Sequence, residues 1–447
     1  MIRKVLIANR GEIAVRIIRA CRELGIKTVA IYSQVDKDAM HTQLADEAIC
    51  VGTSKSKDSY LNESNIISAA VVTGCNAIHP GFGFLSEKAS FAEMCEECNI
   101  KFIGPSSETI EIMGNKSKAR EIMKNSNVPI IPGSDGLINT LDEAYIEAEK
   151  IGYPIMIKAS LGGGGKGIRI VNNRDELGNA FSTAKIEAKS NFNDDSVYME
   201  KFIENPRHIE FQILGDSFGN IIHLGERDCT VQRRNQKVIE EAPSAILSES
   251  LRYEMGEAAI RAAKAVNYVN AGTIEFLLDK HGKFYFMEMN TRIQVEHPIT
   301  EMVTSVDIVK EQLNIASGEE LSFVQDDIKI KGHAIECRIN AENPSKHFAP
   351  SPGKIDFLNI PGGNGIRVDT AAFTGYTIPP TYDSMIAKLI AYGKNRDEAI
   401  NKMLRALDEF IIGGIDSNIE FQIDILNNEK FRLGTYDTSF ISNEFNL

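Results

Sequence analysis

The stretch FMEMNTRIQVEHP, residues 286–298, decides how the rest of this chain is interpreted. It combines acids, an amide and an arginine more densely than an ordinary buried strand does. The period-two alternation over 283–289 predicts a β-strand. One face of this strand is expected to hold Phe284, Phe286, Glu288 and Asn290. A carboxylate and an amide would then extend an aromatic face.

A partner strand is predicted immediately upstream, over 273–279. If 280–283 forms a four-residue hairpin loop, Glu275 lies directly opposite Glu288. Two facing carboxylates repel each other unless a cation lies between them. Oxygen ligands with room for phosphates favour magnesium over zinc. The alternative is a hairpin whose acids face water.

Two further segments upstream contain polar side chains in strand-like patterns. The run 197–203 predicts a short strand whose backbone could meet a planar ligand, and 207–213 alternates so that His208 lies on a polar face. The segment 226–237 concentrates four cations within twelve residues. In an acidic protein this favours a local anion site, with a solvated loop as the alternative.

A glycine run lies between two predicted strands in the middle of the chain. The strand 153–158 ends in Lys158, and the run 162–167 contains Lys166. It is not a Walker A motif, because no Ser or Thr follows Lys166 and 167–171 predicts a strand rather than a helix. We expect a flexible flap whose bare backbone N–H groups approach phosphates.

The N-terminal part predicts a βαβ unit, with strands at 4–8 and 27–32 around a helix at 12–24. Its turn, 9–12, lacks the three glycines of a dinucleotide fingerprint, which argues against a nicotinamide or flavin site. The glycine-rich aromatic stretch 76–87 predicts either a loop that approaches a ligand closely or a tight interdomain turn.

A further unit is predicted from Lys331 onward, after a hinge-like segment at 129–134 earlier in the chain. Its strand at 332–340 would place Glu336, Arg338 and Asn340 on one face. We therefore expect three domains, at 1–114, 115–330 and 331–447, as the length of 447 residues suggests.

Composition narrows the functional class. The formal charge of −13 argues against a general nucleic-acid binder. The N-terminal apolar run is too short for a signal peptide and no later run approaches a membrane span, which predicts a cytoplasmic protein without a membrane partner. Seven scattered cysteines fit reduced thiols, and the lone pair Cys95 and Cys98 is expected to be structural rather than a zinc site.

The acids, lysines and glycine flap together resemble the ATP-grasp enzymes. Among these, biotin carboxylases are the most similar, especially the free-standing type of bacterial acetyl-CoA carboxylase, across essentially the whole chain. The matching segments are 7–14, 79–81, 227–229, 288–297 and 336–339. The resemblance implies an α/β protein, α+β overall: an N-terminal parallel βαβ domain, a central ATP-grasp domain with a mobile glycine-rich lid at about 131–203, and a C-terminal mixed α/β domain.

The resemblance also implies an activity. ATP with Mg²⁺ or Mn²⁺ would activate bicarbonate as carboxyphosphate, and the carboxyl group would pass to biotin on a carrier protein. This is the first half-reaction of acetyl-CoA carboxylase in fatty acid biosynthesis, or else that of a pyruvate or other acyl-CoA carboxylase. The implied partners are a biotin carboxyl carrier protein, carboxyltransferase subunits and a second copy of the chain.

Roles follow residue by residue from the resemblance. Magnesium ligands are Glu275, Glu288 and Asn290, and the bicarbonate site is Lys237, Arg292, Gln294 and Val295. Glu296 is the general base and Arg338 faces biotin, so the expected catalytic set is Lys237, Arg292, Glu296 and Arg338. ATP contacts are Lys116, Lys158, Gly164, Gly165, Glu200, Lys201, Ile203, His208, Gln232, Glu275, Leu277 and Glu288.

Two positions depart from the family pattern, and two rival functions remain. Asn235 stands where histidine is common and Thr381 where tyrosine is common. One rival is another ATP-grasp ligase that joins a carboxylate to an amine, and the other is a non-catalytic nucleotide sensor. No Met-Lys-Met triplet occurs in the sequence, so we expect biotin to be supplied by another polypeptide.

Overall fold

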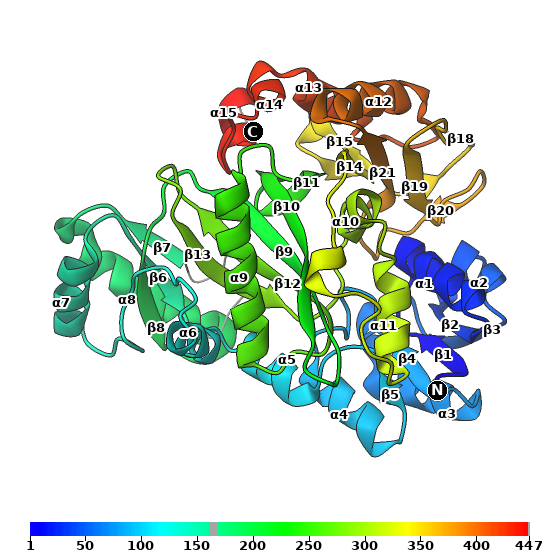
Figure 1. Ribbon diagram of the computed structural model, residues 1–447, viewed down its shortest axis with the longest axis horizontal. Coiled ribbons are helices and arrows are strands. Elements are labelled where there is room, and N and C mark those ends of the chain that lie inside the picture. Colours follow the sequence, from blue (N-terminus) through cyan, green and yellow to red (C-terminus); the bar gives the residue numbers. More distant parts are fainter. Residues whose placement is uncertain (161–167, 446–447) are drawn as a thin grey trace.

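The computed structural model describes residues 1–160 and 168–445. The N-terminal part is a parallel sheet in the order β3-β2-β1-β4-β5, with helices on both faces (Figure 1). The predicted βαβ opening is present, because β1 is almost wholly buried and α1 turns Ile13 and Ile17 inward. The elements are β1 Lys4–Ile7, α1 Gly11–Glu23, β2 Lys27–Ser33, α2 Met40–Leu44, β3 Glu47–Gly52, α3 Glu63–Val72, β4 Ala77–His79, α4 Ala89–Glu97, β5 Lys101–Phe102, α5 Ser107–Gly114 and α6 Lys116–Asn125.

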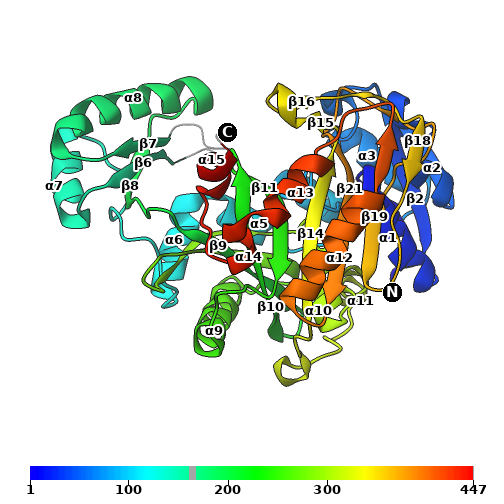
Figure 2. The same cartoon turned by 90° about the horizontal axis from the view of Figure 1, so that it is seen from above.

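A small antiparallel sheet with two helices projects to one side of the molecule (Figure 2). Its strand order is β7-β6-β8, so the strands predicted on both sides of the glycine run pair directly. The run itself, with Gly164 and Gly165, lies outside the described residues. The elements are α7 Leu141–Ile151, β6 Ile155–Ala159, β7 Ile168–Val171, α8 Arg174–Phe192 and β8 Val197–Lys201.

An eight-stranded antiparallel sheet forms the centre of the molecule, in the order β13-β12-β9-β10-β11-β14-β21-β19. Helix α9 packs on one face of β9 and β10 (Figure 1). The sheet runs on across the boundary expected at Lys331, because β11 pairs with β14. The elements up to this boundary are β9 Arg207–Gly215, β10 Ile221–Arg233, β11 Gln236–Ala242, α9 Glu249–Ala265, β12 Asn270–Leu278, β13 Phe284–Asn290, α10 His297–Thr304 and α11 Ile308–Ala316.

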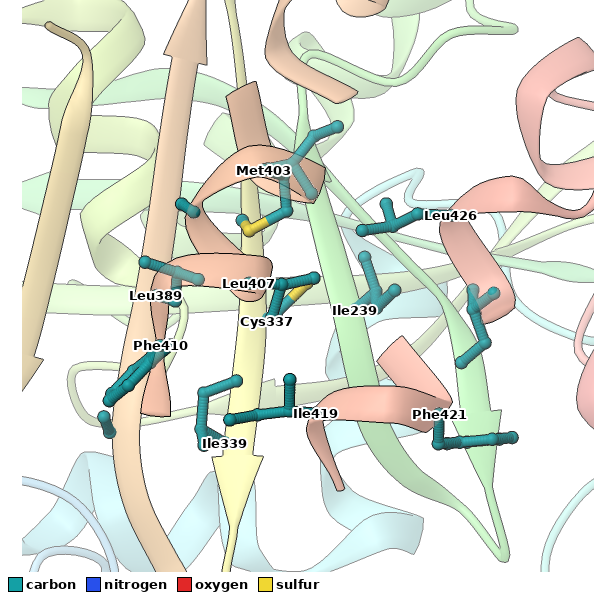
Figure 3. Packing of buried hydrophobic residues seen from close by; sticks show 14 of the residues in the cluster. Ile239, Cys337, Ile339, Leu389, Met403, Leu407, Phe410, Ile419, Phe421 and Leu426 are labelled. Atoms are coloured by element: carbon teal, nitrogen blue, oxygen red, sulfur yellow. The ribbon is translucent and has the colours of Figure 1, made fainter. Parts of the chain in front are cut away.

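The C-terminal part contributes the far strands of this sheet and a layer of helices over them. Figure 3 shows their core, in which Met403 and Leu407 of α12 pack near Cys337 of β14 and Leu389 of β21. The elements are β14 His333–Asn340, β15 Glu342–Asn343, β16 Ala349–Pro350, β17 Gly353–Lys354, β18 Phe357–Asn359, β19 Ile366–Thr370, β20 Thr377–Ile378, β21 Met385–Gly393, α12 Arg396–Glu409, β22 Ile411–Gly413, α13 Ile419–Asn427, α14 Glu429–Leu433 and α15 Phe440–Phe445.

The β12–β13 hairpin differs from the sequence prediction in two ways. The loop spans Asp279 to Lys283, one residue longer than expected, so Leu278 pairs with Phe284. A β-bulge at Met287 then restores the register, and Glu275 does face Glu288. The bulge also makes the expected face assignment wrong. Phe284 and Phe286 lie in the buried core together with Met289, on the side opposite Glu288.

No helix within residues 1–160 and 168–445 has the length and apolar character needed to span a membrane.

Candidate active site

A cavity of about 1370 Å³ opens where all parts of the chain meet. The N-terminal sheet contributes its βα turn and residues 82–84, and the small sheet contributes β6 and β8. The central hairpins and β14 supply the remaining walls. Every described ATP, metal, bicarbonate and biotin residue expected from the sequence lines this cavity except Glu296, which is fully buried just behind its wall.

Lys237 lies at the centre of a carboxylate cluster behind this wall. Its ammonium donates to Glu210 and to Glu296, both at 2.6 Å, and to Glu275 at 3.1 Å. Burial alone would lower the pKa of Lys237, but Cys229 and these three carboxylates raise it well above its ordinary value. Lys237 is therefore a permanent cation beside Glu296.

Glu296 is held from two sides. Its second carboxylate oxygen accepts from the Arg338 guanidinium at 3.0 Å, while Arg338 also donates to Glu240 at 2.6 Å. Burial favours the protonated acid, yet Lys237 and Arg338 hold the pKa of Glu296 well below its usual range. Pro298 starts α10 directly after Glu296, which therefore occupies the N-cap of that helix.

The magnesium ligands expected from the sequence meet at one end of the cavity. Asn290 donates to Glu275 at 2.8 Å, and the Lys116 ammonium lies 4.0 Å from Glu288. Burial and the facing Glu275 raise the pKa of Glu288. Three oxygen donors, two of them repelling each other, fit a hard divalent cation such as Mg²⁺.

Two other groups bring metal-ligand atoms within 4.8 Å of one another: His208, Glu210 and Glu275, and Glu210, Cys229 and Glu296. The Lys237 ammonium already neutralises the carboxylates of both groups. A metal ion there would have to displace a buried lysine. The pair Glu275 and Glu288 with Asn290 is therefore the better cation site.

The residues expected to bind the nucleotide line the same end of the cavity. Lys158 on β6 forms an ion pair with Glu200 on β8, and Gln232 donates to the His208 ring at 2.7 Å. Burial lowers the pKa of His208, but Glu275 outweighs this and raises it. Lys201 is a partial exception, because its ammonium donates to the carbonyls of Gly152 and Tyr153.

The expected bicarbonate residues lie on the segment between β13 and α10. Arg292 donates to the Gln294 amide oxygen at 3.0 Å and to Glu87 at 2.9 Å. It also reaches the Asn290 amide oxygen, at 3.0 Å. Arg292 thus connects the metal end of the cavity with the anion end.

The four cations of 226–237 do not form a solvated loop. They belong to the β10–β11 hairpin, whose turn is Arg234 and Asn235. Arg227 is fully buried and donates to Glu210 at 2.6 Å and to Gln212 at 2.8 Å. Of these cations, Arg227 supports the sheet and Lys237 faces the carboxylate cluster.

Comparisons with known proteins cover the whole length. The family model "Biotin carboxylase, N-terminal domain" matches residues 1–110, "Carbamoyl-phosphate synthase L chain, ATP binding domain" matches 115–324, and "Biotin carboxylase C-terminal domain" matches 336–443. Biotin carboxylase 1 of Bacillus subtilis is 60% identical over 99% of this chain and 98% of its own length. The chain belongs to the biotin carboxylase family.

Solved structures of the family agree with this. The biotin carboxylase–βγ-ATP complex from Campylobacter jejuni is 49% identical, with a TM-score of 0.95 over 99% of both chains. The biotin carboxylase domain dimer of Hydrogenobacter thermophilus 2-oxoglutarate carboxylase, in complex with MgADP, ADP and bicarbonate, is 51% identical with a TM-score of 0.93, over 99% of this chain and 98% of that one.

Sequence reasoning missed several residues that position this biotin carboxylase site. Glu87 orients Arg292, Arg120 donates to Glu200 at 3.1 Å, and Glu240 holds Arg338. Glu87 ends the glycine-rich stretch 76–87, which was an available signal. Arg120 and Glu240 lie in ordinary helix and strand patterns, so nothing local marked them.

The two family departures lie on the cavity wall. Asn235 is at the tip of the β10–β11 hairpin with φ +62°, and Thr381 lies next to Tyr382. Tyr382 stacks against Arg10, whose guanidinium carbon is 4.3 Å from the ring centre. Both departures are therefore away from the Lys237 cluster and the facing acids.

Proposed function

We propose that this chain is an ATP-dependent ligase that carboxylates biotin with bicarbonate. The observation on which this rests most is the Lys237 ammonium 2.6 Å from Glu296, with Arg338 on the other side of the same carboxylate. The facing acids Glu275 and Glu288 lie at the other end of one cavity. A phosphate donor and a small anion could therefore meet between the two ends.

We assign roles on this basis. Glu275, Glu288 and Asn290 would hold Mg²⁺, which when bound neutralises charge on the ATP phosphates. Lys116 and Lys158 supply further positive charge beside them. Positioning and charge stabilisation contribute most of the acceleration in phosphoryl transfer.

Bicarbonate would bind between Lys237 and Arg292. Its O–H proton passes to Glu296 as its oxygen attacks the γ-phosphorus and ADP leaves, which yields carboxyphosphate. The low pKa of Glu296 makes it a weak base while Lys237 and Arg338 are both paired with it. A bound anion that draws these cations toward itself would raise the pKa of Glu296 and make it a better base.

Arg338 would face the biotin ureido group. When the ureido nitrogen loses its proton, negative charge develops on the ureido oxygen. A guanidinium held by Glu240 and Glu296 is well placed to stabilise this charge by a short hydrogen bond.

The partners follow from the same proposal. We infer that a separate biotin-bearing carrier delivers the ring, since no Met-Lys-Met triplet occurs in the sequence, and that carboxyltransferase subunits use the product. A homodimer is supported by the dimer in the Hydrogenobacter structure. Seven free cysteines fit a cytoplasmic location.

The final acceptor and the domain boundaries are also proposals. Identity to Bacillus subtilis biotin carboxylase 1 favours an acetyl-CoA carboxylase of fatty acid biosynthesis. The similarity to a pyruvate carboxylase component of Methanothermobacter thermautotrophicus, 55% identical over 99% of this chain and 90% of its own length, keeps a pyruvate carboxylase as the alternative. Boundaries at 1–114, 115–330 and 331–447, with a lid at about 131–203, are supported by the spans of the three family models.

The test is phosphate release from MgATP with and without bicarbonate, each with and without free biotin. We expect release that requires bicarbonate and rises with biotin. Release that requires an amine instead of biotin would favour the rival ATP-grasp ligase. Nucleotide binding without release under any of these conditions would favour the sensor.

A further inference from the structure

Lys388 is a fully buried lysine for which the proposed mechanism has no role. It lies on β21, where its ammonium donates to the Val295 carbonyl at 3.0 Å. The same ammonium is 3.1 Å from a Glu12 carboxylate oxygen on α1 and 3.8 Å from Asp369 on β19. One side chain thus joins the N-terminal helix, the C-terminal strands and the segment between β13 and α10.

This arrangement is costly for a purely structural contact. Desolvating a lysine and a carboxylate can cost more than their attraction returns, and apolar residues of similar volume often serve stability as well. Glu12 is also buried, which raises its pKa to about 7 although Lys388 opposes this. The cost is understandable if Lys388 has a positional role.

The position of Lys388 suggests what that role is. Lys388 pairs directly with Arg338 across β14 and β21, so both side chains leave the same face of the sheet. Arg338 contacts Glu296, and Lys388 contacts the carbonyl of the preceding residue, Val295. The two neighbouring cations therefore fix the side chain of one site residue and the backbone beside it.

We propose that Lys388 is a positioning residue that fixes the 292–296 segment through the Val295 carbonyl. The inference rests on the proposed function, in which this segment binds bicarbonate and supplies the base. Without the Lys388 contact the peptide between Val295 and Glu296 is free to rotate. Arg292 and Glu296 would then lose their alignment, and a displacement of about 1 Å can cost about 100-fold in rate.

The first test is Lys388→Met, which keeps the length of the side chain and removes the donor. We expect the KM for bicarbonate to rise roughly 10- to 100-fold. The KM for ATP should stay within about twofold, because the nucleotide residues lie on other strands. Hydrogen exchange of the 292–296 amides should accelerate at least about tenfold, a readout that needs no turnover.

A second variant separates positioning from folding. Lys388→Met leaves Glu12 without its counter-charge, so thermal stability falls for that reason alone. In the double variant Glu12→Gln with Lys388→Met both charges are gone, and we expect much of the stability to return. The KM for bicarbonate and the fast exchange at 292–296 should remain as in the single variant.

Lys402→Met is a matched control. The Lys402 ammonium also donates to a backbone carbonyl, that of Tyr392 at 2.9 Å, and lies 3.0 Å from a Glu398 oxygen. It is on α12 and does not line the cavity. Its loss should leave the KM for bicarbonate and exchange at 292–296 unchanged.

The outcomes are distinct. If wild-type protein shows no bicarbonate-dependent phosphate release, the proposed function is wrong, and hydrogen exchange alone decides whether Lys388 fixes the segment. If wild-type protein turns over but the double variant has a normal KM for bicarbonate and normal exchange at 292–296, the positioning role is wrong. A double variant with a raised KM and fast exchange, beside a normal Lys402→Met control, supports it.

Discussion

At the residue scale, the strongest feature is a carboxylate, Glu296, that is buried and yet kept charged. Its two cation contacts, Lys237 and Arg338, explain why. A base of this kind is inactive until an anion competes for those cations. Such a design would limit ATP use when bicarbonate is absent.

Glu296→Gln tests the assignment of the base. The amide keeps the shape of the side chain but cannot accept a proton, so bicarbonate-dependent turnover should fall by about 10² to 10⁴. Affinity for MgATP, measured by calorimetry, should stay near normal because the nucleotide residues lie elsewhere in the cavity. Turnover close to that of the wild-type protein would rule out Glu296 as the base.

Glu288 makes the requirement for magnesium depend on pH. Its pKa is raised by burial and by Glu275, and a metal ligand must be deprotonated. Apparent Mg²⁺ affinity should therefore decrease as pH falls through this raised pKa. Glu288→Gln should weaken Mg²⁺ binding and flatten that dependence, whereas Glu121→Gln, an exposed acid on α6, should change neither. An unchanged Mg²⁺ titration in Glu288→Gln would contradict the facing-acid site.

The Glu275–Glu288 pair also shows the limits of sequence reasoning about residues. The pairing was predicted correctly although the loop was taken one residue too short, because the bulge at Met287 compensates. Bulges depend on packing of both faces, which a strand period does not reveal. Glu87 and Lys388 reach their partners across 205 and 93 residues, so no local pattern could have identified those contacts.

At the element scale, the β10–β11 hairpin aligns Gln232 with Lys237 in direct register. Its two turn residues, Arg234 and Asn235, have φ of +51° and +62°. Both values require the left-handed region, which Gly and Asn tolerate and β-branched residues do not. The turn therefore determines where the Lys237 ammonium lies.

Asn235→Gly should match or slightly exceed wild-type stability, while Asn235→Val should lower the free energy of unfolding by about 1–3 kcal/mol. Chemical denaturation measures both. If the two variants unfold alike, the left-handed turn is not what this position requires. The same pair shows whether the family departure at Asn235 affects turnover beyond its effect on the turn.

Long elements were predicted more accurately than short ones. The predicted strands at 153–158 and 207–213 and the helix beginning at Leu141 match β6, β9 and α7 closely. Two-residue strands such as β15 and β17 were not predicted. Their pairing is set by neighbours far along the chain, and two residues are too few to show a period.

At the scale of the whole molecule, the sheet that joins the central and C-terminal parts was not foreseen. The pairing of β11 with β14 joins residues about 95 apart, such as Ile239 with Cys337. As a result Arg338 and Glu296, from different expected domains, share one buried ion pair. Hydrophobic patterning predicted the strands, but it contains no information on which strands meet.

Glu241 links stability of the whole fold to pH. Burial opposes its charge, but His333 and Arg396 lower the pKa of this buried acid to about 2, below the unfolded value of about 4.5. Its contribution is therefore present above about pH 4.5 and lost as pH falls toward 2. This loss should reach about 3 kcal/mol, measured by denaturation at several pH values. Glu241→Gln should remove that part of the acid dependence, while the exposed Glu254→Gln should keep it.

The central claim is that bicarbonate attacks ATP in the Lys237–Arg292–Glu296 site. The attacking oxygen of bicarbonate forms the new bond to the γ-phosphorus and stays on phosphorus when the carbon–oxygen bond of carboxyphosphate breaks. The most direct measurement uses bicarbonate labelled with oxygen-18, MgATP and biotin, quenched before the label exchanges with water, with mass analysis of the phosphate. We predict one oxygen-18 atom in each phosphate released. Bicarbonate-dependent phosphate release without the label would mean that water attacks ATP, and would contradict the account.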